Sequence, residues 1–236
     1  NALALHTGQA QIALAQSVTS LDAIGGKPPF QEPLENICNI ATFYRQYFQV
    51  VTLAESSVNN PYDLKNKVLA TQPRGATGEA ITNHLLQAHN MSYDSLENVS
   101  FGSYTDSVTH MKDGNADVFT LTTTIPSGAV MDLASSRSIK LMPMSEESHK
   151  KMLEINSKYE RGLIPKGTYP EQSNDVPTIF WYTHLAARCD VENNVISHIL
   201  DVVQSGSMEL VSVTKAIAGL DIETMTRDIG VPMHPG

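Results

Sequence analysis

The chain has 236 residues, enough for one large domain or for two of about 100 residues each. Hydrophobic residues make up 41% of it and charged residues 17%, which is typical of a globular protein with a sizeable core. The net charge of -9 leaves no basic patch, so nucleic acid is not expected as a partner. No run approaches the roughly 18 apolar residues of a membrane span, and no signal peptide is recognisable.

The first third of the chain mixes short helices with β-rich runs. Because Asn1 opens an apolar segment, we expect a mature or truncated N-terminus, with helix over residues 1–6 stopped by Gly8. A strand over 10–15 and a short helix over 18–24 should follow. Residues 37–53 form a long β-rich run, either one strand or two joined by a bend.

The middle of the chain alternates between strand and helix patterns. Strands are predicted at 67–70, 96–100, 116–121 and 139–144, and helices at 79–89, 103–112, 125–135 and 146–159. Residues 164–177 are rich in Pro and Gly and should be irregular but ordered, and 176–187 should be a buried strand. Helices are expected at 191–204 and 208–218.

The two long β-rich runs, 37–53 and 176–187, organise the domain prediction. Each would carry the chain across from one lobe to another, which makes lobe 1 discontinuous (1–53 plus 176–236) and lobe 2 an insertion (54–175), with a cleft between. The alternating elements favour an α/β fold with a parallel sheet in each lobe. Trp181 and Tyr182 face opposite ways on the return strand, so one of them either lines the cleft or packs in the core.

A short internal echo points to strand ends as ligand sites. Residues 6–13 and 112–119 both read as a helix ending at Gly, followed by a strand that opens with x-Ala-x-apolar. The first strand ends in Gln16 and Ser17, and the second ends in Thr122, Thr123 and Thr124. Ligands of open parallel sheets lie beyond the carboxyl ends of the strands, so these residues are candidates.

The loop RGATGE lies between a predicted strand and a predicted helix. It contains Arg74, Gly75, Ala76, Thr77, Gly78 and Glu79. Its amides and the helix dipole can bind an anion, and Arg74 can pair with a carboxylate. The alternative is an ordinary strand-to-helix turn. Neither the phosphate-loop nor the dinucleotide-binding spacing is present.

No pattern for catalysis or for a metal occurs in the sequence. The eight histidines lack acidic or cysteine partners at ligand spacing, and no G-x-S-x-G elbow occurs, so we expect no catalytic residue, no metal and no cofactor. Cys38 and Cys189 both lie in apolar contexts. Buried thiols are the simpler interpretation, and a disulfide between the two crossing regions is the alternative.

Several stretches together resemble one family. These are GTYP followed by DVPT (167–178), the ending VPMHPG (231–236), YDLKNKV (62–68), and the strand ending in Gln16. They resemble the TAXI family of solute-binding proteins of TRAP transporters, over nearly the whole chain and in order. The family's first strand and Gly-rich loop have no counterpart here, and the sequence GATGE departs from its GSGTE loop.

The resemblance implies a two-lobed, periplasmic binding protein-like (type II) fold with the ligand in the cleft. It also implies a monomeric, periplasmic or otherwise extracytoplasmic protein that is not an enzyme and that passes a small organic acid or amino acid to permease subunits in the membrane. The implied ligand residues are Gln16, Ser17, Tyr44, Gly75 to Glu79, and Thr122 to Pro126. An enzyme or an effector-sensing domain on the same bilobed fold is the alternative function.

Overall fold

The computed structural model describes residues 1–206, 209, 211–212, 215–218 and 220–236. Its helices are α1 (Ala2–His6), α2 (Ser17–Ile24), η1 (Pro61–Leu64), α3 (Thr77–Ala88), η2 (Tyr93–Ser95), α4 (Tyr104–Lys112), α5 (Gly128–Ala134), α6 (Glu146–Ile155), α7 (Asn193–Ser205), η3 (Lys215–Ile217) and α9 (Ile222–Met225). Its strands are β1 (Ile12–Gln16), β2 (Cys38–Leu53), β3 (Val68–Thr71), β4 (Asn98–Phe101), β5 (Val118–Thr123), β6 (Ile139–Leu141), β7 (Glu160–Ile164) and β8 (Val176–Ala187). The helix expected over 208–218 lies partly outside the described residues.

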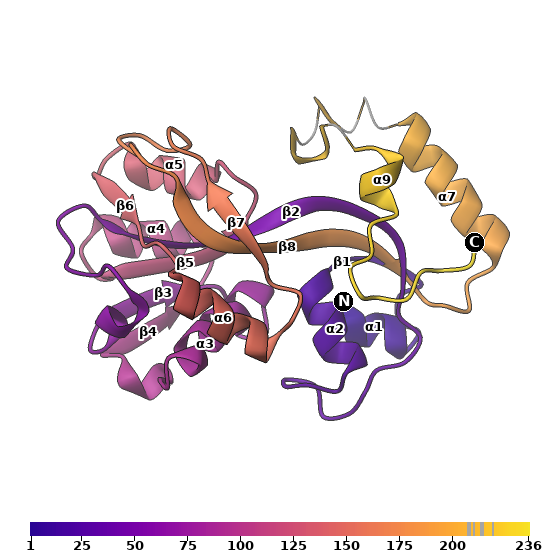
Figure 1. Cartoon of the computed structure of the whole chain (residues 1–236), viewed down its shortest axis with the longest axis horizontal. Helices are drawn as coiled ribbons and strands as arrows, with labels where there is room; N and C mark the ends of the chain where they lie inside the picture. The colour runs from indigo at the N-terminus through magenta and orange to yellow at the C-terminus, as the bar shows by residue number, and fades with distance from the viewer. Residues whose placement is uncertain (207–208, 210, 213–214, 219) are drawn as a thin grey trace. The chain divides into compact units, whose positions relative to one another are not determined.

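The described chain forms two compact units. Unit 1 contains Asn1–Arg45 and Trp181–Gly236, and unit 2 contains Gln46–Phe180. The two boundaries fall inside β2 and β8, the long strands that carry the chain from one unit to the other (Figure 1). The lobe boundaries expected from the sequence, 53/54 and 175/176, stay a prediction, and each unit is described by itself below.

The sheet of unit 2 combines parallel and antiparallel strands. Strand β3 pairs in parallel with both β4 and β5, as βαβ connections require. Strand β2 then pairs antiparallel with β5, where Gln49 faces Leu121, and β7 pairs antiparallel with β8. The expected parallel sheet is therefore confirmed only for β3, β4 and β5.

Alternation along β5 assigns the helices of unit 2 to the two faces of its sheet. Phe119 and Leu121 pack with α4 and α5 in a core that also contains Met111 and Leu133. The intervening residue, Thr120, faces α3 on the opposite side, where its hydroxyl oxygen lies 2.9 Å from that of Thr82, since successive strand residues point to opposite sides. Helix α6 packs against α3.

The irregular stretch before β8 is held by internal hydrogen bonds, as its composition predicts. The Gln172 side chain donates to Ile164 O (3.1 Å) and Asn174 O (2.9 Å), and accepts from Tyr169 N (3.2 Å). The buried Tyr169 hydroxyl donates to Gln49 Oε1 and accepts from Ser127 N (2.9 Å). This stretch therefore attaches to the residue that precedes α5. Strand β7, which leads into it, was not expected from the sequence.

In unit 1, β1 pairs antiparallel with β8, with Gln16 opposite Thr183. A parallel sheet was expected here, and that prediction is wrong for this pair. The helix–Gly–strand echo is confirmed: α1 and α4 both end just before a glycine with positive φ, Gly8 at 75° and Gly114 at 73°. Glycine adopts this left-handed conformation without steric cost, which stops each helix and turns the chain into a strand.

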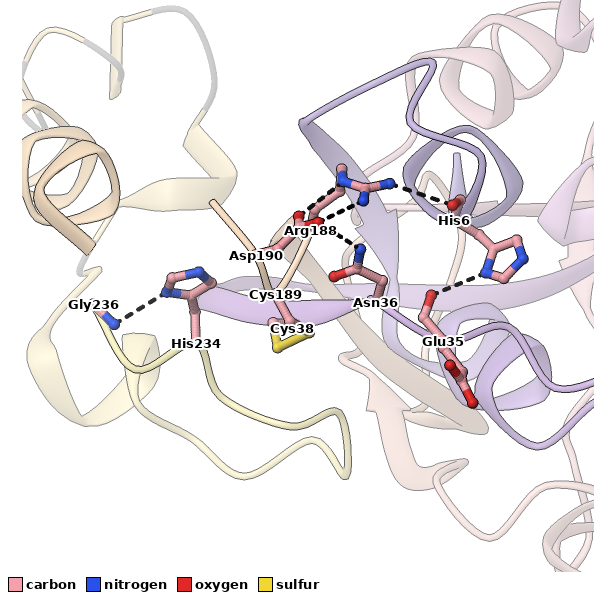
Figure 2. Close-up of a disulfide and its surroundings, with 9 residues drawn as sticks. All are labelled: His6, Glu35, Asn36, Cys38, Arg188, Cys189, Asp190, His234 and Gly236. Atoms are coloured by element: carbon pink, nitrogen blue, oxygen red, sulfur yellow. Dashed lines mark hydrogen bonds and ion pairs between the residues drawn. A yellow bond between two sulfur atoms is a disulfide. The ribbon is translucent and has the colours of Figure 1, made fainter. Parts of the chain in front are cut away.

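A disulfide joins the two chain segments of unit 1. Cys38 begins β2 and Cys189 follows β8, and their sulfur atoms are bonded (Figure 2). The interpretation as buried free thiols is therefore wrong. Next to the disulfide, Arg188 pairs with Asp190 (2.6 Å) and donates to Leu5 O (2.9 Å), which ties the same region to α1.

A buried polar group lies in the core of unit 1. His184 is fully buried, with Nε2 2.9 Å from Ser20 Oγ and Nδ1 3.0 Å from Asn39 Oδ1. The backbone of Asn39 also accepts from His234 N (2.8 Å) and donates to Pro232 O (2.7 Å). This residue therefore connects β2 to β8 and to the C-terminal segment.

Candidate functional site

The polar residues of unit 2 gather where its parallel strands end. The carboxyl ends of β3, β4 and β5 lie at one edge of the sheet because these strands run in the same direction. Three segments follow them: residues 72–76, which lead into α3, residues 102–103, which lead into α4, and residues 124–127, which lead into α5. The structure therefore brings the RGATGE loop and the Thr122–Pro126 segment to one edge.

A hydrogen-bond network centred on Gln72 joins the first of these segments to the end of β5 and to the first residue of α4. Gln72 Oε1 accepts from Thr122 Oγ1 (2.9 Å), and Gln72 Nε2 donates to the Tyr104 hydroxyl (3.0 Å). Tyr104 in turn donates to Thr122 O (2.6 Å), and burial raises the pKa of its phenol. Each of these polar groups has a partner, so the network fixes the ends of β3 and β5 relative to each other.

Gly78 is required beside this network. A Cβ at this position would lie 1.4 Å from Gln72 Oε1 and 3.0 Å from Thr122 Oγ1. A side chain at this position would displace the Gln72 amide from its place against the first turn of α3. Gly78 therefore acts through its lack of a side chain.

Buried threonines continue the polar contacts beneath α3. Thr82 Oγ1 donates to Gly78 O (2.7 Å), and Thr120 Oγ1 donates to Thr71 Oγ1 (2.9 Å). Thr71 Oγ1 lies 3.2 Å from Thr82 Oγ1. Since each hydroxyl has one proton, Thr71 then donates to Thr82, and all three hydroxyls are satisfied. These contacts hold the N-terminal half of α3 to the sheet.

The Glu79 side chain stabilises the RGATGE loop through hydrogen bonds. Its carboxylate accepts from Gly75 N (3.3 Å) and from the Tyr93 hydroxyl (2.9 Å). Burial and the neighbouring Glu79 carboxylate raise the pKa of Tyr93, which keeps its hydroxyl protonated as a donor. Gly75 has a φ of 82°, so it supplies the left-handed turn that the loop needs.

The N-terminus of α3 carries the partial positive charge of the helix. Ala76 is the N-cap residue, and it has no side-chain oxygen that could cap the helix. The N–H groups of the first helical turn have no acceptor within a helix, and the helix dipole adds partial positive charge there. Glu79, which lies in the same turn, partly offsets that charge.

Arg74 is exposed and stacks on aromatic rings. Its guanidinium carbon lies 4.0 Å from the centroid of Phe101 and 5.7 Å from that of Tyr93. Those two rings meet edge to face at 5.3 Å. In the described part of the chain no carboxylate forms an ion pair with Arg74. The guanidinium is thus oriented while its hydrogen-bonding fork stays available for an acidic group.

The Thr122–Pro126 segment is anchored at its first two residues, and Ser127, which follows the segment, donates its N–H to the Tyr169 hydroxyl. Thr122 belongs to the Gln72 network, and Thr123 pairs with Tyr47 of β2. Thr124 is half-buried, and a cis peptide bond precedes the exposed Pro126. Helix α5 begins after Ser127, so the helix expected from 125 starts three residues later.

The candidate ligand residues Gln16 and Ser17 of unit 1 already form hydrogen bonds within the protein. Gln16 Oε1 accepts from Trp181 Nε1 (2.8 Å), and Gln16 Nε2 donates to Thr183 Oγ1 (3.2 Å). Ser17 is buried and accepts from Tyr182 N (3.2 Å). Tyr44 lies half-buried on β2. Their contacts to a ligand stay a prediction.

Sequence reasoning missed Gln72, Tyr93, Phe101 and Tyr104. Gln72 lies two residues after the predicted strand 67–70, and Thr122 follows the predicted strand 116–121, so the strand-end rule could have included Gln72 as well. Tyr93 and Phe101 become relevant only through their stacking with Arg74, and no sequence pattern encodes that contact.

Two Ser–His hydrogen bonds resemble parts of a nucleophilic site but are buried. Ser148 Oγ lies 2.9 Å from His89 Nε2, and Ser20 Oγ lies 2.9 Å from His184 Nε2. All four side chains are buried, so a substrate cannot reach them. Burial lowers the pKa of His184 to about 4, which keeps its ring neutral. These contacts join elements of each core.

The described residues contain neither a metal-binding cluster nor a membrane-spanning helix. Among them, no three Asp, Glu, His or Cys side chains lie close enough together to hold a metal ion. None of the described helices has the length and apolar character to cross a membrane. Surface pockets occur between β6 and residues 169–176, and beside α9, away from the Gln72 network.

Comparison with known proteins gives a family and a fold. The model of the NMT1-like family matches residues 1–236. Among solved structures, the periplasmic aliphatic sulphonate binding protein SsuA from Escherichia coli is 11% identical with a TM-score of 0.50, and the match covers 93% of this chain and 65% of that one. A Listeria monocytogenes protein, provisionally named an L-cystine ABC transporter, is 14% identical with a TM-score of 0.54. The match covers 92% of this chain and 74% of that one. A TctC solute binding protein from Polaromonas is 14% identical (TM-score 0.50; 91% and 68% covered).

These similarities confirm the predicted fold class. The chain has the mixed α/β fold of periplasmic binding proteins and matches type II solute-binding structures. At this level of identity the solved structures establish the fold, and the ligands of those proteins do not transfer to this chain.

Proposed function

The chain belongs to the NMT1-like family, and from this premise we propose that it is the extracytoplasmic solute-binding component of a TRAP-type secondary transporter. It captures a small carboxylate or an amino acid, glutamate-like or a dicarboxylate, and delivers it to the membrane permease. It captures this ligand without chemical conversion. The TAXI-like motifs support the transporter type, and the fold supports solute binding.

One observation carries the proposal: the arrangement at the strand ends of unit 2. An exposed guanidinium stacks on Phe101, and the N-terminus of α3, where Ala76 supplies no side-chain cap, follows it in the sequence. Both groups favour an oxyanion, since Arg pairs with carboxylates through a fork of N–H groups and helix N-termini attract negative charge. The Gln72 network fixes the loops that carry them, so little ordering is needed when a ligand binds.

The disulfide supports the proposed compartment. Disulfides persist mainly in oxidising environments such as the periplasm or the outer surface of the cell, and they are rare where cytosolic thiol systems operate. The Cys38–Cys189 bond therefore agrees with an extracytoplasmic protein.

Calorimetric titration tests the proposal. The full chain is titrated with L-glutamate, succinate and other amino and dicarboxylic acids, and saturable 1:1 binding of at least one acid is expected. Arg74→Ala should weaken that binding by about 2–3 kcal/mol, the scale of a hydrogen bond to a charged group. Arg137→Ala is the matched control, because Arg137 is a surface cation of the same unit that pairs with Glu55 (3.5 Å). No binding across the panel by the oxidised chain would overturn the proposal.

A further inference from the structure

Among the described residues, the guanidinium of Arg227 in unit 1 interacts through its charge with the Asp221 carboxylate but forms no ion pair with it. In the described part of the chain, Arg227 is the one arginine or lysine with a solvent-shielded polar atom, Nε, that has no hydrogen-bond partner. No carboxylate of the described residues forms an ion pair with it either. Shielding a charged donor from water without a partner is unfavourable, so such a group usually has an anion to bind.

The carboxylates of two neighbouring residues, Asp221 and Asp228, accept hydrogen bonds from backbone N–H groups. Asp221 caps α9 by accepting from Thr224 N (2.8 Å), and Asp228 accepts from Gly230 N (2.7 Å). Both carboxylates therefore stabilise backbone turns on either side of Arg227. The chain places three acidic residues, Asp221, Glu223 and Asp228, within six positions of this arginine, and none of them forms an ion pair with its guanidinium.

The backbone of Arg227 is fixed. Its carbonyl accepts from Thr42 Oγ1 (3.3 Å), and its amide donates to Thr224 O (3.2 Å). Thr42 is itself buried on β2 and accepts from Asn39 Nδ2 (3.2 Å). The backbone from which the side chain extends is thus attached to the β2 strand.

The guanidinium is also oriented. Its central carbon lies 5.3 Å from the centroid of the Tyr182 ring, close enough for a cation–π contact. Tyr182 is buried on β8, and its backbone amide donates to Ser17 Oγ. Tyr182 therefore links Arg227 to Ser17, which the sequence already marks as a ligand candidate.

We propose that Arg227 is the cation of an oxyanion site in unit 1, where its guanidinium, backed by the Tyr182 ring, binds the carboxylate of a small acid. This inference deepens the proposed function and rests on it, because it names a second arginine, in addition to Arg74 of unit 2, that binds a carboxylate of the solute. The sequence alone pointed to Arg74 and offered no reason to choose Arg227.

The first test uses the fluorescence of Trp181, the single tryptophan of the chain, which neighbours Tyr182. Wild type, Arg227→Gln and Arg227→Lys are titrated with L-glutamate and with succinate. Arg227→Gln should weaken binding at least about 10-fold, the loss expected for one charge-assisted fork, and Arg227→Lys should weaken it less. The control Arg137→Gln removes the same charge from unit 2 and should stay within about twofold of wild type.

A second test works on wild type and does not depend on the variants folding. Phenylglyoxal modifies exposed arginines, and peptide mass spectrometry gives the rate at each one. A saturating acid should slow the modification of Arg227 and leave that of Arg137 unchanged. If an acid binds while Arg227 reacts at the same rate, or Arg227→Gln binds normally, the inference is overturned and the proposed function stands. If no acid binds to wild type, both fall together.

Discussion

Gly78 is the residue of unit 2 at which one added methyl group should do the most damage. Gly78→Ala places a Cβ 1.4 Å from Gln72 Oε1, so the Gln72 amide must move and its bonds to Thr122 and Tyr104 are lost. We expect a loss of about 1–3 kcal/mol in the free energy of unfolding, measured by urea denaturation.

The matched control for this substitution is Gly128→Ala in α5. Nothing lies within 4 Å of a Cβ added there, and alanine is the better helix former. This variant should be neutral or more stable by up to about 1 kcal/mol. Equal stability of the two variants would show that the Gln72 network does not depend on Gly78.

His184 should make the stability of unit 1 depend on pH. Its pKa in the folded protein is lowered from 6.5 to about 4 by burial, so the folded state holds the ring neutral. The unfolded chain binds the proton first as the pH falls, and stability is therefore full above about 6.5 and is lost between pH 6.5 and 4. The loss is on the order of 3 kcal/mol.

Urea denaturation of wild type and His184→Gln at pH 7 and pH 4.5 measures this effect. A glutamine side chain cannot titrate, so the pH-dependent loss in the variant should be smaller by most of the His184 contribution. Asp190 does not interfere, because its pKa of about 2, lowered by Arg188, moves its own transition to more acidic conditions. Equal pH dependence in the two proteins would contradict the prediction.

Strands β2 and β8 are the elements on which unit 1 depends, because they bring its two chain segments together. The Cys38–Cys189 bond joins the start of one to the end of the other across a separation of 151 residues, and all of unit 2 lies within this covalent loop. Replacing both cysteines by serine should lower the stability of unit 1 by about 3 kcal/mol, since the bond closes a short loop of unit 1 residues on either side of the folded unit 2.

Native-state hydrogen exchange locates that loss. Amides of β1 and of the C-terminal half of β8 should exchange faster in the double variant, while β3 and β5 of unit 2 should keep their protection. Treatment of wild type with dithiothreitol should reproduce the pattern. Uniform loss of protection in both units would argue that they unfold as one.

Elements with a clear period were predictable from the sequence, and contacts between elements were not. The alternating strand and helix patterns over residues 67–159 predicted the elements from β3 to α6. Strands of parallel sheets are apolar runs, and in helices the apolar residues recur every three to four positions. Strand β7 was missed, since Glu160, Arg161 and Gly162 give it no apolar pattern. The stacking of Arg74 on Phe101 joins residues 27 positions apart, and only the folded chain brings them together.

At the scale of the whole molecule, the chain is one unit inserted into another, and the inserted unit should fold by itself. All the strand pairs and the main apolar core of unit 2 lie within Gln46–Phe180. Thr178 Oγ1 donates to Phe48 O, so the two ends of this segment lie side by side on neighbouring strands. A domain whose termini meet loses little when it is excised.

The excised fragment 46–180 tests this organisation. It should give dispersed amide resonances and a single cooperative urea transition, because its core is complete. The fragment 68–180 is the control. It lacks the β2 segment that pairs with β5, and with it Gln49, the hydrogen-bond partner of Tyr169. It should be far less stable or unfolded, since β5 then has an unpaired edge and the Tyr169 hydroxyl loses its acceptor. If both fragments are unfolded, the core of unit 2 requires unit 1, and the inserted unit is not an independent domain.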